Sequence, residues 1–271
     1  MTLLIAVGTG DGLILAGDSR TTLSPPDQRW RVLSDFTHKV FQVDRFAVAT
    51  SGWAFLQGRN IAAHMAEFVQ EFTGQGKSPE DLSNELADFF GKRLNEHISS
   101  GMDEAPAADA VVISLVVHGY NEGQGECWEV TFPSGAAVRH FTTESGGAIW
   151  RGQTDVVTRL IKGFDPTLGQ RVSNDTALTY ALQSLQPSME GMEYVINLRF
   201  MNLQDAIDLA VLLIRTTIDV QRLTNGLVSE PGSFPGVGGP IEIALVTPDG
   251  FSWIQRAALL GERPSGRAED L

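Results

Sequence analysis

The apolar positions of this chain form unbroken runs near its start and helical repeats further along. Residues 3–9 and 12–18 are apolar almost throughout, and the turn Gly10-Asp11-Gly12 between them predicts a tight β-hairpin. Strands that are apolar on both faces are typical of a sheet covered on both sides. The stretches THKVFQVD and RFAVATSG predict a second hairpin around Asp44-Arg45.

Helical spacing and strand-like runs then alternate along the rest of the chain. We predict helices over 53–72, from Ser78-Pro79 onward, over 153–163 and from Asn202 to about Leu223, with a helix and loop mixture over 165–200. Strands are predicted over 109–118, 126–132 and 136–143, followed by a turn at SGGAIWRG (145–152). A last hairpin is predicted around Pro248-Asp249-Gly250, after the Gly/Pro-rich loop 225–240.

Strands grouped on either side of a pair of helices favour an α+β fold. The arrangement that buries every apolar face is a four-layer αββα sandwich, with two stacked and mostly antiparallel sheets between helical layers. No change in composition marks a domain boundary, so residues 1–260 are expected to form one domain. Residues 261–271 are expected to form a flexible tail.

Composition and charge narrow the classes of function. The 271 residues carry a formal net charge of −13, which disfavours a broad nucleic-acid interface. The single cysteine, Cys127, excludes an intrachain disulfide framework and is expected to serve packing. There is neither a signal peptide nor an apolar run of membrane-spanning length, so a soluble, cytoplasmic protein is expected. The five histidines are scattered and no metal motif occurs, so neither metal nor cofactor is expected.

The second residue carries the first candidate chemistry. Processing of Met1 by an aminopeptidase would leave Thr2 as the N-terminus, with its hydroxyl and a free α-amine on the same residue. Such an amine has a pKa of about 7.7–8.0 and is able to act as a base near neutral pH. A threonine hydroxyl activated by its own amine is a known nucleophile and base pair. Taken alone, however, Thr2 is more simply a small residue that is tolerated after Met1.

Three further residues make this chemistry more specific. Asp18 ends the second apolar strand beside the first, and Lys39 begins the next hairpin as a partner of opposite charge. An Asp–Lys pair beside a threonine hydroxyl would favour the alkoxide. Gly52 stands where a strand meets a predicted helix, a place that offers free backbone N–H groups for an oxyanion hole. Each residue taken singly is explained as well by a strand end or a turn.

The three segments that carry these residues together resemble a known family. TLLIAVGTGDGLILAGDSRTT, HKVFQVD and FAVATSG are similar to the proteasome β-subunit family of N-terminal-nucleophile hydrolases, which includes HslV and the bacterial proteasome-like (Anbu-type) proteins. The likeness is strong over residues 2–60 and weaker beyond. It implies that Thr2 is the nucleophile, its amine the base, Asp18 and Lys39 the supporting charged pair, and the Gly52 N–H the oxyanion donor. Arg20 also matches a basic position of the family.

The same resemblance implies where a peptide would bind. The backbone of Thr21 and Thr22 would align it as an added strand. The specificity pocket would be lined by small or apolar groups, which suit an uncharged side chain before the scissile bond: Thr21, Thr37, Phe41, Thr50 and Ala54. Ser145 matches a serine that lies beside the nucleophile in the family. Either Asp219 or Gln221 would take the supporting role of an aspartate on the late helix.

The function expected from the resemblance is that of a threonine peptidase that hydrolyses peptide bonds through an acyl-enzyme on Thr2. It needs no cofactor, acts on peptides or unfolded proteins, and works as a ring-like homo-oligomer; whether an ATPase partner exists stays open. Neither nucleic acid nor a membrane is expected as a partner. Two alternatives remain: a non-catalytic scaffold subunit, and an amidase for a small-molecule amide.

Overall fold

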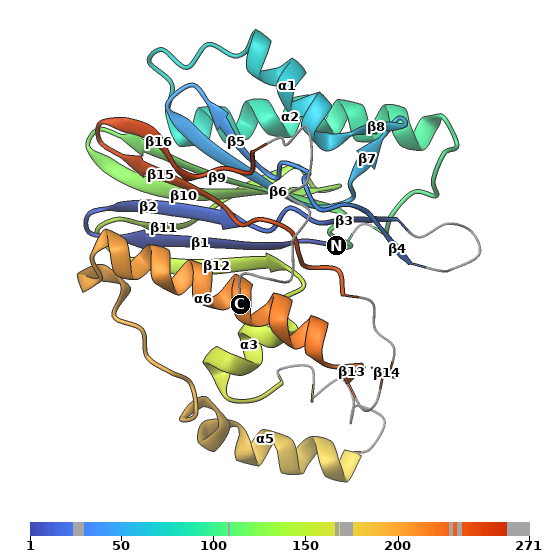
Figure 1. The fold of residues 1–271 in the computed structure, drawn as a ribbon, viewed down its shortest axis with the longest axis vertical. Coiled ribbons are helices and arrows are strands. Elements are labelled where there is room, and N and C mark those ends of the chain that lie inside the picture. Colours follow the sequence, from blue (N-terminus) through green and yellow to red (C-terminus); the bar gives the residue numbers. More distant parts are fainter. Residues whose placement is uncertain are drawn as a thin grey trace, which may run out of the picture.

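Two five-stranded sheets lie face to face in the computed structural model, with helices on their outer surfaces (Figure 1). The structure describes residues 1–23, 30–107, 109–165, 168, 176–227, 230–231 and 235–258. The predicted four-layer αββα sandwich with antiparallel sheets is confirmed. The expected flexible tail, 261–271, lies outside the described residues.

The first sheet contains the beginning of the chain. Its strand order is β12-β1-β2-β15-β16, and each neighbouring pair is antiparallel. The strands are β1 (Leu3–Thr9), β2 (Gly12–Gly17), β12 (Gly147–Gly152), β15 (Glu242–Thr247) and β16 (Gly250–Gln255). Every residue of β1 and β2 is buried, so the apolar runs do form a sheet covered on both faces.

The second sheet has the order β11-β10-β9-β6-β5. Its strands are β5 (Val40–Val43), β6 (Phe46–Gly52), β9 (Ile113–Asn121), β10 (Gln124–Phe132) and β11 (Ala136–Thr142). Three short pairs stand apart from the sheets: β3 (Thr21–Leu23) with β4 (Arg31–Ser34), β7 (Phe55–Leu56) with β8 (Arg59–Asn60), and β13 (Gly226–Leu227) with β14 (Glu230–Pro231).

The helices form the two outer layers. Helices α1 (Ile61–Glu71) and α2 (Pro79–Ser99) cover the second sheet, and α3 (Asp155–Lys162) and α6 (Leu203–Leu223) cover the first (Figure 1). Helix α2 starts as predicted, because Ser78 and Asp81 form a capping box and Pro79 occupies the first turn. A 3-10 turn, η1 (Leu198–Phe200), precedes α6. No described helix has the length and apolar content needed to cross a membrane.

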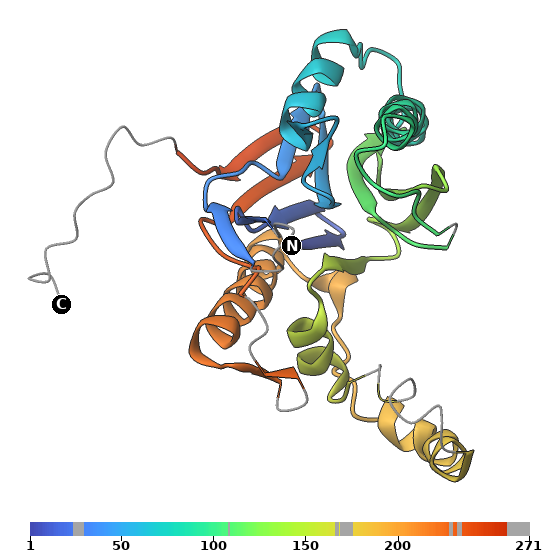
Figure 2. The same cartoon turned by 90° about the vertical axis from the view of Figure 1, so that its right-hand side faces the viewer.

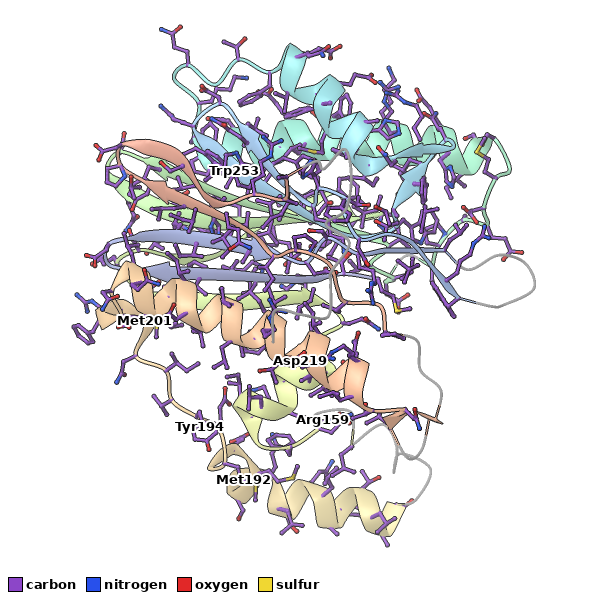
Figure 3. All side chains as sticks on the ribbon, viewed as in Figure 1. Arg159, Met192, Tyr194, Met201, Asp219 and Trp253 are labelled. Atoms are coloured by element: carbon purple, nitrogen blue, oxygen red, sulfur yellow. The ribbon has the colours of Figure 1, made fainter. Side chains whose placement is uncertain are left out.

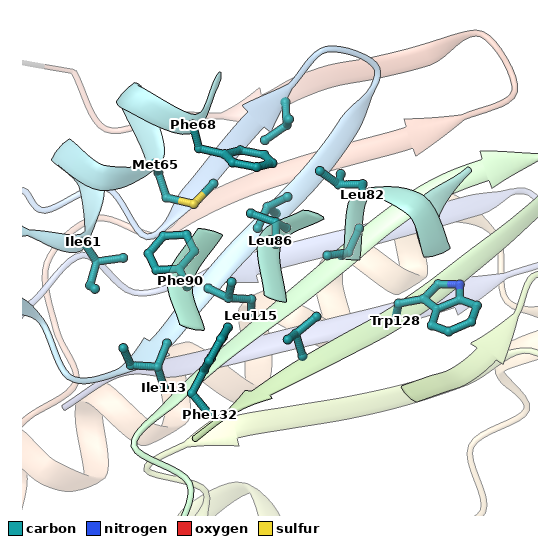
Figure 4. Packing of buried hydrophobic residues seen from close by; sticks show 14 of the residues in the cluster. Ile61, Met65, Phe68, Leu82, Leu86, Phe90, Ile113, Leu115, Trp128 and Phe132 are labelled. Carbon is teal, nitrogen blue, oxygen red and sulfur yellow. The ribbon is translucent and has the colours of Figure 1, made fainter. Parts of the chain in front are cut away.

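Three apolar layers hold the sandwich together. Phe90, Leu86 and Met65 pack under α1 and α2 against the second sheet (Figure 4). Leu213, with other α6 residues, packs on β1 and β2 from the other side. The layer between the sheets contains Cys127, which is buried, as expected for a packing residue.

Helix α5 (Thr176–Glu190) has no buried residue and lies apart from the sandwich (Figure 2). Met192 and Tyr194 lie between α5 and α3 (Figure 3) and are themselves exposed. The backbone of Tyr194 is attached to α3, since its N–H donates to the Ile161 carbonyl at 2.8 Å. Exposed apolar side chains therefore lie on the surface of the molecule beside α5 and α3.

Two predictions are wrong: where the first helix begins, and the turn over residues 145–152. Residues 53–60 form the small β7–β8 pair rather than the start of a helix, because Gln57 and Gly58 adopt positive φ and Asn60 caps α1 only at residue 61. Residues 147–152 form strand β12 rather than a turn. The local sequence favours a turn because glycines lie at both ends of this six-residue segment, whereas its strand partner, β1, lies far away in the sequence.

Candidate active site

The backbone of Thr2 is held between two strands of the first sheet. Its carbonyl accepts a hydrogen bond from the Gln153 N–H at 2.7 Å, and the next N–H, of Leu3, donates to Asp18 Oδ1 at 2.9 Å. Gly152 has φ +95°, and a Cβ there would lie 1.8 Å from the Thr2 carbonyl oxygen. Only glycine therefore allows β12 to approach Thr2 this closely.

Asp18 is fully buried at the end of β2 and is surrounded by donors. Besides Leu3, the Lys39 ammonium donates to Oδ1 at 2.8 Å, while Oδ2 accepts from the N–H groups of Arg20 at 3.1 Å and Gly238 at 3.0 Å. Four donors compensate for burying this charge. The carboxylate thus joins β1, the β2 end, the 235–240 segment and the second sheet at a single point.

Lys39 reaches from the second sheet to the peptide bond that precedes Thr2. Its Nζ lies 3.2 Å from the Met1 carbonyl oxygen, which belongs to the same peptide group as the Thr2 nitrogen. Burial lowers the pKa of Lys39, and the charge of Asp18 opposes that effect. Burial and the Lys39 charge likewise lower the pKa of the Met1 amine, which donates to Thr22 Oγ1 at 3.2 Å.

Gly52 ends β6 beside the same cleft. Its φ is +101°, and a Cβ would lie 2.1 Å from the Val112 carbonyl oxygen, so no other residue fits without moving the backbone. The Trp53 N–H donates to the carbonyl of Val112, just before β9, while the Thr50 N–H donates to the carbonyl of Lys39 on the opposite side. The N–H groups of successive residues in a strand point to opposite sides, so the Gly52 N–H points to the same side as that of Thr50. On that side it faces the cleft near Lys39, which precedes β5.

Most residues expected at the site line one cleft, and four are not among its lining residues: Asp18, Thr22, Phe41 and Ser145. The lining includes Thr2, Thr21, Thr37, Lys39, Thr50, Gly52 and Ala54, together with Met1, His38, Ser51, Trp53, Ile61 and Ala62. Phe41 is not among the lining residues, since its side chain packs against the core under α1 and α2. Thr22 meets the cleft only through its hydroxyl bond to the Met1 amine.

Ser145 lies at the far end of β12. The register pairs Leu3 with Gly152 and Gly8 with Gly147, so the turn that holds Ser145 is about 20 Å along the strand from Thr2. There its hydroxyl bonds to Thr142 within the turn and to no other described residue. The residue next to Thr2 is Gln153, which directly follows β12. A strand prediction for residues 147–152 would have identified it.

Gln153 connects the site to the late helix. Gln221 on α6 donates from Nε2 to Gln153 Oε1 at 3.1 Å and accepts from the Val237 N–H at 3.0 Å. Asp219 instead pairs with Arg222 on the exposed side of α6 (Figure 3). Of the two alternatives left open by the sequence, Gln221 is therefore the one that contacts Gln153, the residue hydrogen-bonded to the Thr2 carbonyl.

A second buried carboxylate, Glu242, was not singled out from the sequence. It starts β15, is fully buried, and contacts the segment that carries Lys39. The feature of the sequence that could have identified Glu242 is its position as the one charged residue inside the apolar run PIEIALV. Arg20, which matched a basic family position, pairs with Asp35 at 2.6 Å and donates to the Pro235 carbonyl at 3.1 Å, so it holds the 235–240 segment.

No group of three or more potential metal ligands from His, Cys, Asp and Glu occurs within the described parts of the chain. What the cleft does offer is a threonine hydroxyl, a buried lysine–aspartate pair and a backbone donor. These are the components of acyl transfer on a hydroxyl nucleophile.

Comparisons with known proteins agree with this architecture at the level of the fold. No protein-family model and no curated protein sequence matches the chain. Among solved structures, an Anbu (Gly-1) mutant from Hyphomicrobium sp. strain MC1 is similar with a TM-score of 0.53 at 16% identity, over 94% of this chain and 85% of that one. The helical assembly of the Anbu complex from Pseudomonas aeruginosa is similar with a TM-score of 0.50 at 16% identity, over 90% and 81%. The αββα sandwich predicted from the sequence is thus the fold that this chain shares with the two Anbu structures.

Proposed function

We propose that this protein is an N-terminal threonine hydrolase of peptide bonds, active once Thr2 is the terminal residue. The observation that carries the proposal is the contact of Lys39 Nζ with the carbonyl of the Met1–Thr2 peptide bond, while the same ammonium is paired with Asp18. Removal of Met1 would put a free amine and the threonine hydroxyl beside this pair.

The chemistry follows from these positions. Thr2 Oγ1 attacks the substrate carbonyl carbon while the Thr2 amine accepts the hydroxyl proton. The negative oxygen that forms is stabilised by the Gly52 N–H, and the positive charge of Lys39 favours the alkoxide character of the nucleophile. The amine then passes the proton to the leaving amine, the C–N bond breaks, and water hydrolyses the ester that remains on Thr2.

A peptide is the substrate class that suits the edges of the cleft. β3, which includes Thr21, is paired only with β4 among the described strands, so its other edge is available for an added strand. The side chain before the scissile bond would enter among Thr37, Thr50 and Ala54. These hydroxyl and methyl groups carry no charge, which favours an uncharged side chain.

We also propose that the chain works as a homo-oligomer. The related Anbu complex of Pseudomonas aeruginosa forms a helical assembly. Here, the exposed apolar residues Leu178, Tyr180 and Leu185 lie on α5, which contributes nothing to the core. Sedimentation of the purified protein is expected to give a species larger than one chain. Replacing these three residues by Ser is expected to reduce the mass of that species.

Intact mass spectrometry with a peptide epoxyketone tests the catalytic proposal. The Met-free protein is expected to gain one inhibitor adduct and to cleave peptide reporters. Thr2→Ala should abolish both, Thr2→Ser should keep the adduct, and Thr9→Ala, at the other end of β1, serves as the matched control. A folded, Met-free protein that neither gains an adduct nor cleaves any reporter contradicts the proposal.

The same experiment separates the two alternatives. A scaffold subunit would assemble normally and remain unlabelled with Met1 either present or absent. An amidase for small molecules would be labelled at Thr2 by a small electrophile but would leave peptide reporters intact.

A further inference from the structure

Glu242 is a buried carboxylate whose only polar contacts among the described residues lie in the segment that carries Lys39. Its Oε2 accepts from the Lys39 N–H at 3.2 Å and, at 3.5 Å, from the Val40 N–H. Its Oε1 lies 2.5 Å from His38 Nδ1. A carboxylate at 0% exposure is costly to bury, so three contacts converging on consecutive residues indicate a specific role for it.

The position of Glu242 relates it to Asp18. Glu242 pairs with Gly17 in the register of β15 and β2, and Asp18 directly follows Gly17. The two carboxylates therefore belong to neighbouring strands of the first sheet, while Lys39 comes from the second sheet. Asp18 holds the ammonium of Lys39, and Glu242 holds its backbone.

His38 completes this arrangement. A carboxylate is only an acceptor, so the proton of the contact between His38 and Glu242 lies on Nδ1. His38 and the two N–H groups together occupy both oxygens of Glu242. This leaves the carboxylate one orientation, with the start of β5 fixed against β15.

We propose that Glu242, oriented by His38, is a positioning residue for Lys39 and sets the approach of its ammonium to Asp18 and to the nucleophile. This inference rests on the proposed function, in which Lys39 supports Thr2. Neither residue needs to touch the substrate for the role, because both act through the backbone of Lys39.

The charge of Glu242 gives the role a signature that simple packing would not have. The charged and titratable groups around the Lys39 ammonium are Asp18 at the end of β2, the N-terminal amine before β1, Arg20 before β3, and Glu242 and His38 behind it. Asp18 and Glu242 favour the charged lysine, whereas burial and Arg20 oppose it. Glu242→Gln is therefore expected to lower the pKa of Lys39 further and to move the alkaline limb of the activity profile to lower pH.

The first measurement does not depend on catalysis. The chain has four lysines, so the ε-carbon signals of Lys39, Lys77, Lys92 and Lys162 are resolvable by NMR in protein labelled with carbon-13 lysine. In Thr2→Ala protein, Glu242→Gln should lower the titration midpoint of Lys39 and leave the other three unchanged. Glu126→Gln is the matched control, since Glu126 is another buried carboxylate, on β10, that pairs with Arg139 and accepts from Trp128.

The second measurement is the rate on a peptide reporter in active, Met-free protein. Glu242→Gln is expected to lower kcat roughly tenfold or more with KM nearly unchanged, because a small misplacement of a catalytic group is costly. His38→Asn, which keeps a donor at the Nδ1 position, should retain most of the rate that His38→Leu loses. Glu126→Gln should keep the parental kcat after correction for the folded fraction.

The outcomes distinguish this inference from the proposed function. An unchanged Lys39 titration, together with a kcat within twofold of the parent, overturns the positioning role. A shifted Lys39 titration in a protein that shows neither adduct nor peptide cleavage supports the contact with Lys39 and refutes the peptidase. If Glu242→Gln does not fold, the comparison of His38→Leu with His38→Asn decides by the same two readouts.

Discussion

His118 is predicted to make the protein sensitive to mild acid. It lies on β9 opposite Ala47 and Cys127, with its ring 6.0 Å from that of Phe141, inside the apolar layer between the sheets. Neither of its nitrogens has a hydrogen-bond partner within the described residues, and its burial is complete. Burial lowers the pKa of His118 from 6.5 to about 3.

The sign and size of the effect follow from these two pKa values. Below pH 6.5 the unfolded chain binds a proton at His118 that the folded protein excludes, so stability is complete above pH 6.5 and is lost as pH falls toward 3. Each unit of pH in this window costs about 1.4 kcal/mol, which amounts to about 2 kcal/mol of unfolding free energy at pH 5. The substitution His118→Leu should remove this dependence while keeping a similar side-chain volume.

Urea unfolding at pH 7.5 and pH 5 measures the difference directly. The loss of stability between the two pH values should be about 2 kcal/mol smaller in His118→Leu than in the parent. Val116→Ala, in the same layer, controls for general weakening, since it should lower stability equally at both pH values. Parallel pH dependences for the parent and His118→Leu, within about 0.5 kcal/mol, would refute the reasoning.

Three other predictions concern the site and its supports. Asp18→Asn leaves the Lys39 ammonium buried without its carboxylate, so urea unfolding should show a loss of about 3 kcal/mol or more, and labelling by the epoxyketone should cease. Gly152→Ala pushes a Cβ onto the Thr2 carbonyl, and should slow labelling roughly a hundredfold while far-UV circular dichroism stays unchanged. Glu129→Gln removes the bidentate partner of Arg151 between the sheets, and should cost about 3 kcal/mol in urea unfolding, a loss that the double variant with Arg151→Met partly restores. Each prediction fails if its variant behaves as the parent does.

Elements with strong local signals were predictable from the sequence. The opening hairpin, the pair around Asp44-Arg45, the capped start of α2 and the last hairpin carry their own turn and capping residues. The sandwich followed from their order. Asp18 and Lys39 were predictable as partners because Asp18 directly follows one apolar strand, Lys39 directly precedes another, and each charge needs compensation there. In the structure, Lys39 Nζ lies 2.8 Å from Asp18 Oδ1.

The surroundings of Thr2 were decided only by the tertiary structure. Gln153, Gly238 and Glu242 come from segments more than a hundred residues from the start of the chain. Gln153 and Gly238 contact the site through their backbone N–H groups, and the Glu242 carboxylate accepts from the backbone N–H of Lys39. Hydrogen bonds to backbone N–H groups and strand registers leave no residue-type pattern, so local sequence does not report them. The sequence alone determined that a hydroxyl, an aspartate and a lysine stand at strand ends near the start of the chain. Strand pairing within the first sheet determined that β12 lies beside the start of β1, with Gln153 rather than Ser145 next to Thr2. The packing of the two sheets determined that Glu242 is the second carboxylate, behind Lys39.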